Sequence, residues 1–337
     1  MYGPEDLRRR RAAVAAALEG RVPRAVPGLA KAFAPANIAL VKYWGKRDGA
    51  LHLPRTGSLS VSLGRWGSEA VLSLVRGAGE VRLNGKTISL DMPFAARAMG
   101  YLSLFRPATG ENFLLDTRNT VPTAAGFASS ASGFAAIAKA LDALFGWNLP
   151  ERNLSVLARL GSGSAARSLR GGFVEWKRGR KEDGSDSFAR GLPVRWEELC
   201  VGAVVVERAE KPLASGEAMR RCVATSPFMR AWDATVRGDL RAAKEAIRRR
   251  DLRALGEVAE GNALAMHAVM LAARESVFYP TGASLEALAA VRRLRAEGVP
   301  VYATMDAGPN VKLLFEEESL PAVRRAFPDA VVLRPFP

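Results

Sequence analysis

A loop of small residues that runs directly into an apolar-periodic segment constrains this chain more than any other feature. Residues 119–133 read NTVPTAAGFASSASG. Pro122 and Gly126 favour a tight turn and the pair Ser129 and Ser130 favours an N-cap, so unpaired backbone N–H groups converge with the positive end of a helix. Because anions bind at such a point, we predict that the loop holds a phosphate chain. An ordinary Ala/Gly/Ser-rich turn is the alternative, since no Gly-Lys-Ser/Thr follows to make a Walker A motif.

The segment after this loop has the spacing of a helix that packs against a core. Phe134, Ile137, Leu141 and Leu144 recur at helical intervals. A helix buried along this face would hold the preceding loop in a constant position.

The chain is long enough to bury a large core. Its 337 residues are 48% hydrophobic, which predicts two lobes within one compact unit. No run approaches the roughly 18 apolar residues of a membrane span, and no convincing cleavage site follows the Arg-rich opening, so we expect a cytoplasmic protein without a membrane partner.

Cysteine and histidine are scarce, which narrows the chemistry. Cys200 and Cys222 lack metal-ligand spacing and are predicted to be buried free thiols. His52 and His267 are the only histidines of the sequence, which argues against His-based catalysis and against a His-rich zinc site. We therefore expect the chemistry to use Asp, Lys, Arg and Ser.

The net charge of +15 makes nucleic-acid binding a candidate function, because Lys and Arg release counterions when they meet a phosphate backbone. The basic residues are spread along predicted helices such as 240–250 and 291–295, mixed with acids and without interleaved aromatics. We therefore expect solvated helix faces, no nucleic-acid partner, and some steering of an anionic substrate.

Local patterns predict an α+β protein with a basic helical extension in 1–25, a first lobe in 26–200 and a second lobe in 201–337. In the first lobe, Asn84-Gly85 predicts a hairpin turn, and the charged segment 177–190 predicts an exposed loop. The ordered body is expected to begin with 32–46, followed by strands at 68–75, 80–83, 87–90, 113–117 and 172–176 and by helices at 94–105 and 153–160. In the second lobe, we expect strands at 201–207, 301–305 and 311–316 and helices at 230–250, 252–273 and 285–297.

Two segments combine residues suited to anion recognition. Residues 37–46 bring together Lys42, Tyr43 and Lys46, two ammonium groups and a phenol, although a partly buried strand with solvated lysines would give the same pattern. The run 161–167 places two glycines and two hydroxyls before Arg167, whose guanidinium suits bidentate pairing with a carboxylate or phosphate. A turn that links two helices is the alternative there.

Two further side chains lie in predicted turns. Asp306 follows a predicted strand and precedes Ala-Gly-Pro, so it could orient or deprotonate a hydroxyl, or only cap the turn. Ser215 lies in a small-residue turn, where it could bind a ligand hydroxyl or only reverse the chain.

Four motifs, in this order and at these separations, closely resemble those of the mevalonate diphosphate decarboxylase family in the GHMP kinase superfamily. They are PANIALVKYWGKRD, PTAAGFASSASGF, GSGSAARSLRGGFVEW and MDAGPN, and the resemblance runs from about Lys31 to the C-terminus. It implies a two-lobe α+β fold, with a ribosomal protein S5 domain 2-like ATP-binding lobe and a ferredoxin-like second lobe. The implied reaction uses ATP and Mg²⁺ to phosphorylate the 3-hydroxyl of 5-diphosphomevalonate, which then loses phosphate and carbon dioxide to give isopentenyl diphosphate. The family is compatible with a homodimer.

The resemblance also implies roles for individual residues. Asp306 would lie near the 3-hydroxyl as base or orienting acceptor, Lys42 would keep that carboxylate ionised, and Arg167 would hold the substrate carboxylate. The rest of the implied substrate site is Tyr43, Trp44, Gly45, Lys46, Ser162, Gly163, Ser164, Ala165, Ala166 and Ser215. The loop implied to wrap the ATP phosphates comprises Pro122, Thr123, Ala124, Ala125, Gly126, Ala128, Ser129 and Ser130.

The chain departs from the family pattern at three places that concern substrate recognition. Thr56-Gly57-Ser58 replaces Asn-Ser-Ser, Gly216 follows Ser215 where relatives often have a hydroxyl, and Phe94 stands where relatives have an Arg, with Arg97 the nearest substitute. These differences leave open the 5-diphosphate, the 5-monophosphate and free mevalonate as substrate. The rival activity is that of a mevalonate 3-kinase, and the remote alternative is a non-catalytic nucleotide- or nucleic-acid-binding protein.

Overall fold

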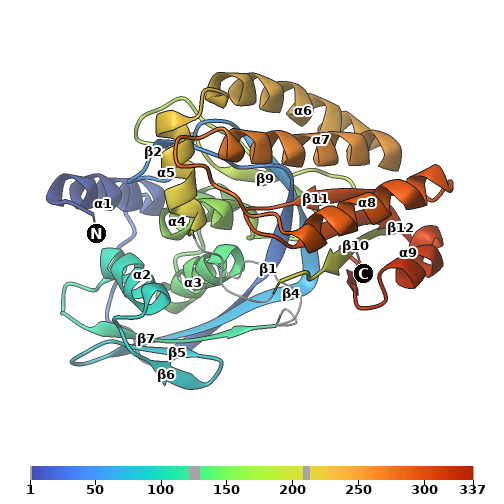
Figure 1. Cartoon of the computed structure of the whole chain (residues 1–337). Coiled ribbons are helices and arrows are strands. Elements are labelled where there is room, and N and C mark those ends of the chain that lie inside the picture. The colour runs from blue at the N-terminus through green and yellow to red at the C-terminus, as the bar shows by residue number, and fades with distance from the viewer. Residues whose placement is uncertain (1, 121–129, 208–212, 337) are drawn as a thin grey trace.

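The computed structural model describes residues 2–120, 130–207 and 213–336, and it shows two main sheets, each packed against helices (Figure 1). The predicted α+β class is confirmed. Within these described ranges, no helix has both the length and the apolar character that a bilayer span requires.

The first sheet is built around one long strand, β4 (Ser58–Val75), which pairs antiparallel with β1 (Leu29–Val41). The strand order is β6-β5-β7-β4-β8-β9, and β1 joins the sheet through β4. The remaining strands are β5 (Glu80–Leu83), β6 (Lys86–Ile88), β7 (Asn112–Asn119), β8 (Phe173–Trp176) and β9 (Ala189–Gly191). A separate small hairpin, β2 (Lys46–Asp48) with β3 (Leu53–Pro54), follows the end of β1.

The helices packed on the first sheet are α1 (Pro4–Leu18), α2 (Pro93–Leu102), α3 (Ser130–Phe145) and α4 (Glu151–Gly161). α3 is the most deeply buried of them, and Phe134, Ile137 and Leu141 are fully enclosed, as the helical spacing predicts. A short turn of 3₁₀ helix, Ser103–Phe105, continues α2.

α1 contributes to the core, which the prediction of an added extension did not include. It buries one face against the first lobe, and the residues of that face are Arg10, Ala13, Val14, Ala17 and Leu18. The four apolar members belong to the same buried cluster as α3 and α4. The ordered body therefore starts at α1 rather than at residue 32.

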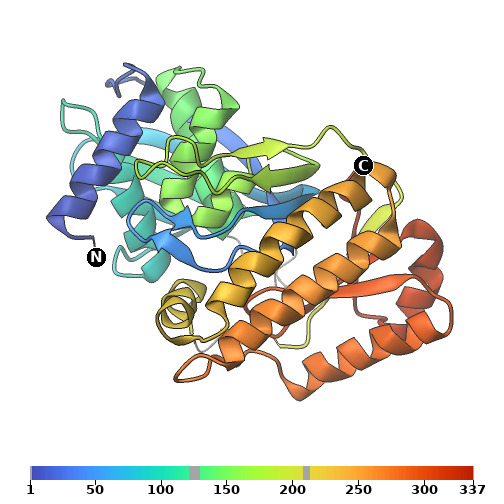
Figure 2. The ribbon, with the colours of Figure 1, turned by 90° about the horizontal axis from the view of Figure 1, so that it is seen from above.

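The second sheet has the order β11-β12-β10-β13, with every pair antiparallel. Its strands are β10 (Leu199–Val204), β11 (Val301–Met305), β12 (Val311–Glu316) and β13 (Val331–Leu333). The helices of this part are α5 (Ser215–Thr225), α6 (Met229–Arg249), α7 (Leu252–Leu271), α8 (Gly282–Ala296) and α9 (Leu320–Ala326). Figure 2 shows α6 and α7 lying side by side along much of their length.

One buried cluster joins the two sheets. It contains Ile38 and Phe173 from the first sheet together with Trp232 from α6, Val269 from α7 and Leu314 from β12. β1 and β12 consequently share a core, in which apolar burial keeps both strands in place. A lobe boundary near residue 200 stays a prediction.

Most predicted elements are confirmed, but some differ from the structure. The Asn84-Gly85 turn has φ of 52° and 79°, as a two-residue hairpin requires, and it joins β5 to β6. The segment 80–83 does not pair with β4, because β7 lies between them. The segment 177–190 is not simply exposed, because buried Arg159 donates to the carbonyl of Gly184 at 2.8 Å. Two helices, α5 and α9, were not predicted.

Candidate functional site

The end of β1 holds Lys42 in a buried position. Its Nζ donates to the carbonyl of Ala39 at 2.8 Å and to Asp306 Oδ1 at 3.0 Å, and the residue is 1% exposed. Its backbone N–H donates to Asn262 Oδ1 on α7 at 2.8 Å, and the amide of Asn262 donates to Asp239 Oδ2 on α6 at 2.7 Å. Two helices of the second lobe therefore position a lysine that the first lobe contributes.

Asp306 is the first residue after β11, and its side chain is 49% exposed, so one side of the carboxylate is open to a ligand. Desolvation alone would raise the pKa of Asp306, but the charges of Lys42, Lys312 and Arg167 together outweigh it and hold that pKa below its usual value. The carboxylate is therefore ionised at neutral pH. Desolvation lowers the pKa of Lys42, and the negative charge of Asp306 opposes this shift.

Lys312 is a third charge at this centre that the sequence analysis did not identify. It lies on β12 opposite Thr304 of β11 and is 4% exposed. Desolvation lowers its pKa to about 8, and the charge of Asp306 opposes this shift. The signal in the sequence is a lone lysine within the otherwise apolar run 311–315, because a lysine is almost never buried without a partner.

Arg167 ends a short 3₁₀ turn, Gly163–Arg167, and is 3% exposed. Its guanidinium donates to the hydroxyl of Ser58 and, at 3.4 Å, to Asn37 Oδ1. Its Nε is buried and, among the described residues, has no hydrogen-bond partner. Desolvation lowers the pKa of Arg167 to about 10, so the group stays charged at neutral pH. A buried cation with an unused donor fits an anionic ligand group.

Tyr43 and Gly163 pack tightly together. The ring of Tyr43 contacts Trp176 edge-on with centroids 4.8 Å apart, and a Cβ on Gly163 would lie 2.6 Å from Tyr43 Oη. That hydroxyl is buried and has no partner in the described part of the chain. Only glycine at position 163 leaves the phenol in this place. A second polar group without a partner among the described residues therefore lies near Arg167. Desolvation raises the pKa of Tyr43, and the charge of Arg167 opposes this rise.

The other predicted substrate residues differ in what they expose. The Trp44 side chain lies in the core, and its carbonyl accepts from Trp232 Nε1 at 3.1 Å, so only its backbone could reach a substrate. Gly45 has φ of 91° and leaves no room for a Cβ. Ala165 and Ala166 are buried, whereas Ser162 and Ser164 are half-buried with their hydroxyls 3.4 Å apart. The proposed contacts of all these residues stay predictions.

Lys46 begins β2 and lies in a second group of positive charges. Desolvation lowers its pKa to about 8, and the charges of Arg220, Arg97 and Arg10 lower it further in the same direction. These arginines come from α5, α2 and α1, so three helices bring cations toward one lysine. Arg97, the nearest substitute for the family's arginine, acts on Lys46, and Ser215 is the first residue of α5.

The start of α3 is fixed from two strands. Ser68 Oγ on β4 lies 2.8 Å from Ser132 Oγ and donates to Asn119 Oδ1 at 2.9 Å. Ser130 is the first residue of α3. The other residues of the predicted phosphate loop lie outside the described residues, and they are Pro122, Thr123, Ala124, Ala125, Gly126, Ala128 and Ser129.

Few side chains in the described ranges are placed to coordinate the metal ion of a bound nucleotide. Within the described ranges, no group of three or more His, Cys, Asp and Glu side chains could hold a metal ion. Mg²⁺ commonly takes one or two carboxylates and completes its coordination with phosphate oxygens and water. The phosphate oxygens of a bound nucleotide and water would therefore supply most of the ligands of Mg²⁺.

Comparisons with known proteins agree with this arrangement. The family model of the diphosphomevalonate decarboxylase-like N-terminal domain matches residues 34–189, and that of the mevalonate 5-diphosphate decarboxylase C-terminal domain matches residues 201–333. The diphosphomevalonate decarboxylase mvd1 of Aspergillus fumigatus is 37% identical over 309 residues, covering 85% of this chain and 76% of that protein. The enzyme of Rattus norvegicus is 35% identical over 323 residues, covering 88% of this chain and 80% of its own.

Solved structures show the same likeness. The complex of MDDEF with MVAPP, AMPPCP and magnesium superposes with a TM-score of 0.86 at 39% identity, covering 91% of this chain and 96% of that chain. The mevalonate diphosphate decarboxylase of Staphylococcus aureus superposes with a TM-score of 0.85 at 35% identity, covering 91% of this chain and 95% of that chain. Both halves of the chain match, in sequence and in fold, and the chain belongs to the diphosphomevalonate decarboxylase family.

Proposed function

We propose that this protein catalyses the ATP-dependent decarboxylation of (R)-5-diphosphomevalonate to isopentenyl diphosphate, with release of ADP, phosphate and carbon dioxide, in the mevalonate pathway of isoprenoid biosynthesis. The observation that carries the proposal is the ion pair of buried Lys42 with half-exposed Asp306, 3.0 Å apart, next to the Arg167 Nε, which has no partner among the described residues. An ionised carboxylate can orient a hydroxyl, and a neighbouring buried guanidinium can hold a carboxylate. One substrate must therefore offer both groups, as mevalonate and its phosphates do.

The ionised carboxylate of Asp306 accepts a hydrogen bond from the tertiary 3-hydroxyl and takes its proton as the phosphoryl group is transferred. Lys42 keeps that carboxylate ionised and in place. When bound, ATP supplies the phosphoryl group and Mg²⁺ neutralises the charge on its phosphates. Hydroxide is a poor leaving group and phosphate a good one, so phosphorylation prepares the 3-oxygen to depart.

Departure of phosphate leaves C3 short of electrons, and the bond between C2 and the carboxylate carbon breaks to supply them, so that the C2=C3 double bond forms as carbon dioxide is released. Arg167 holds the carboxylate before this step and fixes its orientation relative to C3. The buried cations Lys42, Lys312 and Arg167 surround the carboxylate of Asp306 and stabilise the negative charge that collects on the departing phosphate.

The charges around Lys46 support a diphosphate rather than a single phosphate or free mevalonate. The charges of Arg220, Arg97 and Arg10 all act on Lys46 at this end of the site. Gly57 stands in the middle of the segment where the family pattern reads Asn-Ser-Ser, and its surroundings explain this difference. A Cβ at position 57 would lie 3.0 Å from Leu240 Cδ1 and 3.1 Å from the Trp176 carbonyl.

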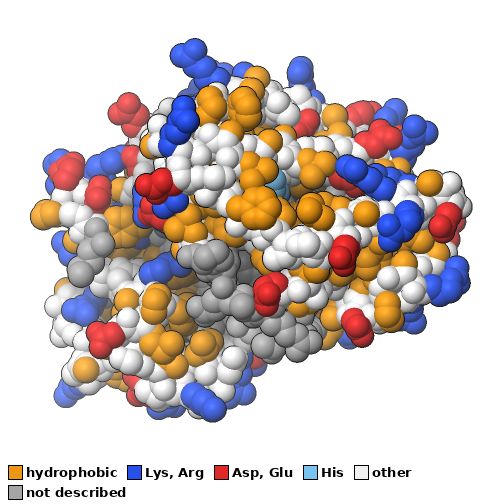
Figure 3. Space-filling model, in the orientation of Figure 1, with side chains coloured by type: hydrophobic (Ala, Val, Ile, Leu, Met, Phe, Trp, Pro, Cys, Tyr) orange, Lys and Arg blue, Asp and Glu red, His pale blue; other side chains and the backbone are white. Residues whose placement is uncertain are grey.

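A cytoplasmic location is part of the proposal, and it is supported by Cys200 and Cys222, which are buried free thiols. Basic side chains on the face in Figure 3 are interspersed with acidic and apolar ones, an arrangement that suits steering better than a nucleic-acid track. The homodimer stays a prediction, which light scattering on the purified protein can check.

The decisive experiment compares mevalonate, 5-phosphomevalonate and 5-diphosphomevalonate with ATP and Mg²⁺ while ADP and carbon dioxide are followed together. We expect equal amounts of both products from the diphosphate alone. Equal release from the monophosphate would change the substrate and keep the mechanism. ADP without carbon dioxide would make the protein a kinase and refute the decarboxylase proposal.

The depressed pKa of Lys46 predicts an alkaline limit to substrate capture. Because that pKa is about 8, the free enzyme loses the ammonium charge as the pH rises through 8, and kcat/KM for the phosphorylated substrate should fall there. A Lys46→Arg variant is the control, since guanidinium stays charged over this range. If kcat/KM of Lys46→Arg fell over the same pH range as that of the wild type, the titration would belong to another group.

A further inference from the structure

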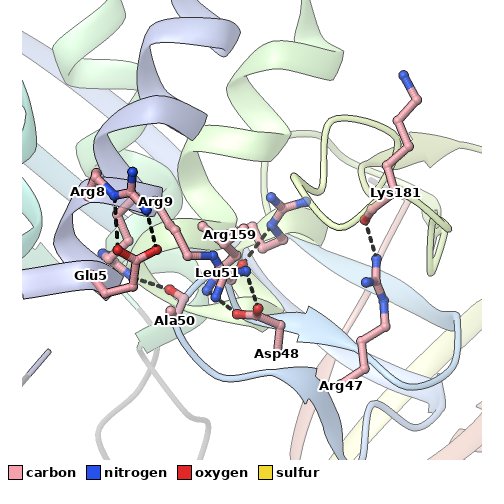
Figure 4. Close-up of polar contacts among 10 residues, drawn as sticks. Glu5, Arg8, Arg9, Arg47, Asp48, Ala50, Leu51, Arg159 and Lys181 are labelled. Carbon is pink, nitrogen blue, oxygen red and sulfur yellow. Dashed lines mark hydrogen bonds and ion pairs between the residues drawn. The ribbon is translucent and has the colours of Figure 1, made fainter. Parts of the chain in front are cut away.

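α1 lies outside the family model that matches this lobe, which begins at residue 34. It nevertheless packs against α4 and reaches the β2–β3 hairpin, and Figure 4 shows its polar contacts there. Arg9 on α1 forms an ion pair with Asp48, which in turn accepts from the backbone N–H of Leu51 at 2.8 Å. The helix therefore contacts the hairpin that begins with Lys46.

Arg10 makes the contact that joins two separate segments. Its Nη1 donates to the carbonyl of Ala50 at 2.6 Å and its Nη2 to the carbonyl of Leu160 at 2.7 Å. The residue is 2% exposed, so both bonds are shielded from water. The guanidinium reaches the two carbonyls with two separate nitrogens, whereas a lysine would need both carbonyls within reach of one nitrogen.

The same two segments are also connected beside Arg10. His52 on the hairpin has its Nδ1 2.9 Å from the carbonyl of Arg159, and its Nε2 lies 2.9 Å from the hydroxyl of Tyr2. The guanidinium carbon of Arg10 lies 4.2 Å from the centre of the Tyr2 ring. The N-terminal residues thus cover a junction between the hairpin and the last turn of α4.

This junction lies between two predicted parts of the substrate site. Lys46 precedes Ala50 in the hairpin, and Ser162 directly follows α4, whose last turn contains Leu160. The carbonyls that Arg10 binds are therefore close in sequence to both, on separate backbone segments. Any change in the spacing of these segments would change the spacing of Lys46 and Ser162.

We propose that Arg10 is a positioning residue that joins the β2–β3 hairpin to the end of α4 and thereby sets the distance between Lys46 and Ser162, two predicted contacts of the substrate. The proposal rests on the proposed function, because it assigns these two residues to one phosphorylated substrate. The N-terminal helix is then a functional part of the substrate site rather than an appendage. No contact of Arg10 with the substrate is implied.

The test compares Arg10→Met and Arg10→Lys with Arg11→Met, which removes an exposed arginine from the neighbouring position of the same helix. We expect Arg10→Met to raise KM for 5-diphosphomevalonate about tenfold while kcat and KM for ATP change little, because misplaced binding groups weaken capture of the substrate. Arg10→Lys, which can keep one of the two bonds, should lie between Arg10→Met and the wild type. Arg11→Met should match the wild type.

A purely structural role would lower the melting temperature of Arg10→Met and leave the ratio of the two KM values unchanged, and that result overturns the proposal. If Arg10→Met does not fold, the ratio of the KM for 5-diphosphomevalonate to the KM for ATP is compared between Arg10→Lys and Arg11→Met, and the same criterion applies. The affinity for inorganic pyrophosphate, measured by calorimetry, is a readout independent of turnover. If the wild type converts none of the three mevalonates, the proposed function fails. Weaker pyrophosphate binding by Arg10→Lys, which keeps the positive charge, than by Arg11→Met would then still support the positioning role, and equal binding would overturn it.

Discussion

Asp306→Asn should lower kcat for the release of both ADP and carbon dioxide by about 10²- to 10⁴-fold, the range expected for loss of a positioned general base. The substitution keeps the size of the side chain and removes its charge, so the amide can neither take the hydroxyl proton nor balance Lys42, 3.0 Å away. Because phosphorylation precedes loss of carbon dioxide, both products should fall together. Coupled ADP detection with released ¹⁴C-labelled carbon dioxide measures both.

Asp329→Asn is the matched control for this experiment, since Asp329 is exposed in the loop after α9. It should retain wild-type rates and stability. If Asp306→Asn kept a tenth or more of the wild-type kcat, the assignment of Asp306 to the reacting hydroxyl would be wrong. A melting curve of Asp306→Asn is needed beside the rates, because Lys42 would lose a charged partner in a buried position.

Arg167→Met should lower kcat/KM for the phosphorylated mevalonate by about 10²- to 10³-fold, because losing one partner of a buried charge pair costs about 2–5 kcal/mol. The arginine is 3% exposed, holds Ser58 and Asn37, and keeps its Nε unused among the described residues. Arg167→Lys should recover little, since a single ammonium cannot keep these contacts and also form a bidentate pair with the carboxylate. Steady-state kinetics with varied substrate and saturating ATP give the comparison.

Arg170→Met is the control for the Arg167 variants. Arg170 lies three residues further along and is half exposed, with Glu151 as its partner at 3.5 Å. Surface ion pairs of this kind contribute little to stability, so the variant should behave as wild type. Wild-type kcat/KM in Arg167→Lys would contradict the carboxylate role, because charge alone would then be sufficient.

Much of this fold could be predicted from local patterns. α3, α6 and α7 lie where helical spacing predicts them, and the Asn84-Gly85 turn has the positive φ values that its residues favour. These features depend on neighbours in the sequence. The pairing of β5 with β7 was missed because strand order depends on contacts between distant segments.

The residues of the candidate site likewise divide into those that the sequence predicts and those that only the structure reveals. The four motifs in the sequence identified Asp306, Lys42 and Arg167, because each occurs in a short segment of recognisable chemistry. Lys312 was missed because its function depends on the charge of Asp306, which follows the neighbouring strand, rather than on its own flanking residues. Asn262 was missed because its hydrogen bond spans 220 residues of sequence to the backbone of Lys42.

The sequence by itself determined the family, the main helices and strands, and the residue types available for chemistry, since all of these follow from local spacing and motif order. Only the tertiary structure decided that α1 belongs to the core, that Arg10 joins the β2–β3 hairpin to α4, and that three buried cations surround the carboxylate of Asp306. The physical reason is that burial and electrostatic interactions depend on distance in space. Folding brings Lys42 within 3.0 Å of a carboxylate 264 residues away, and no local pattern records that distance.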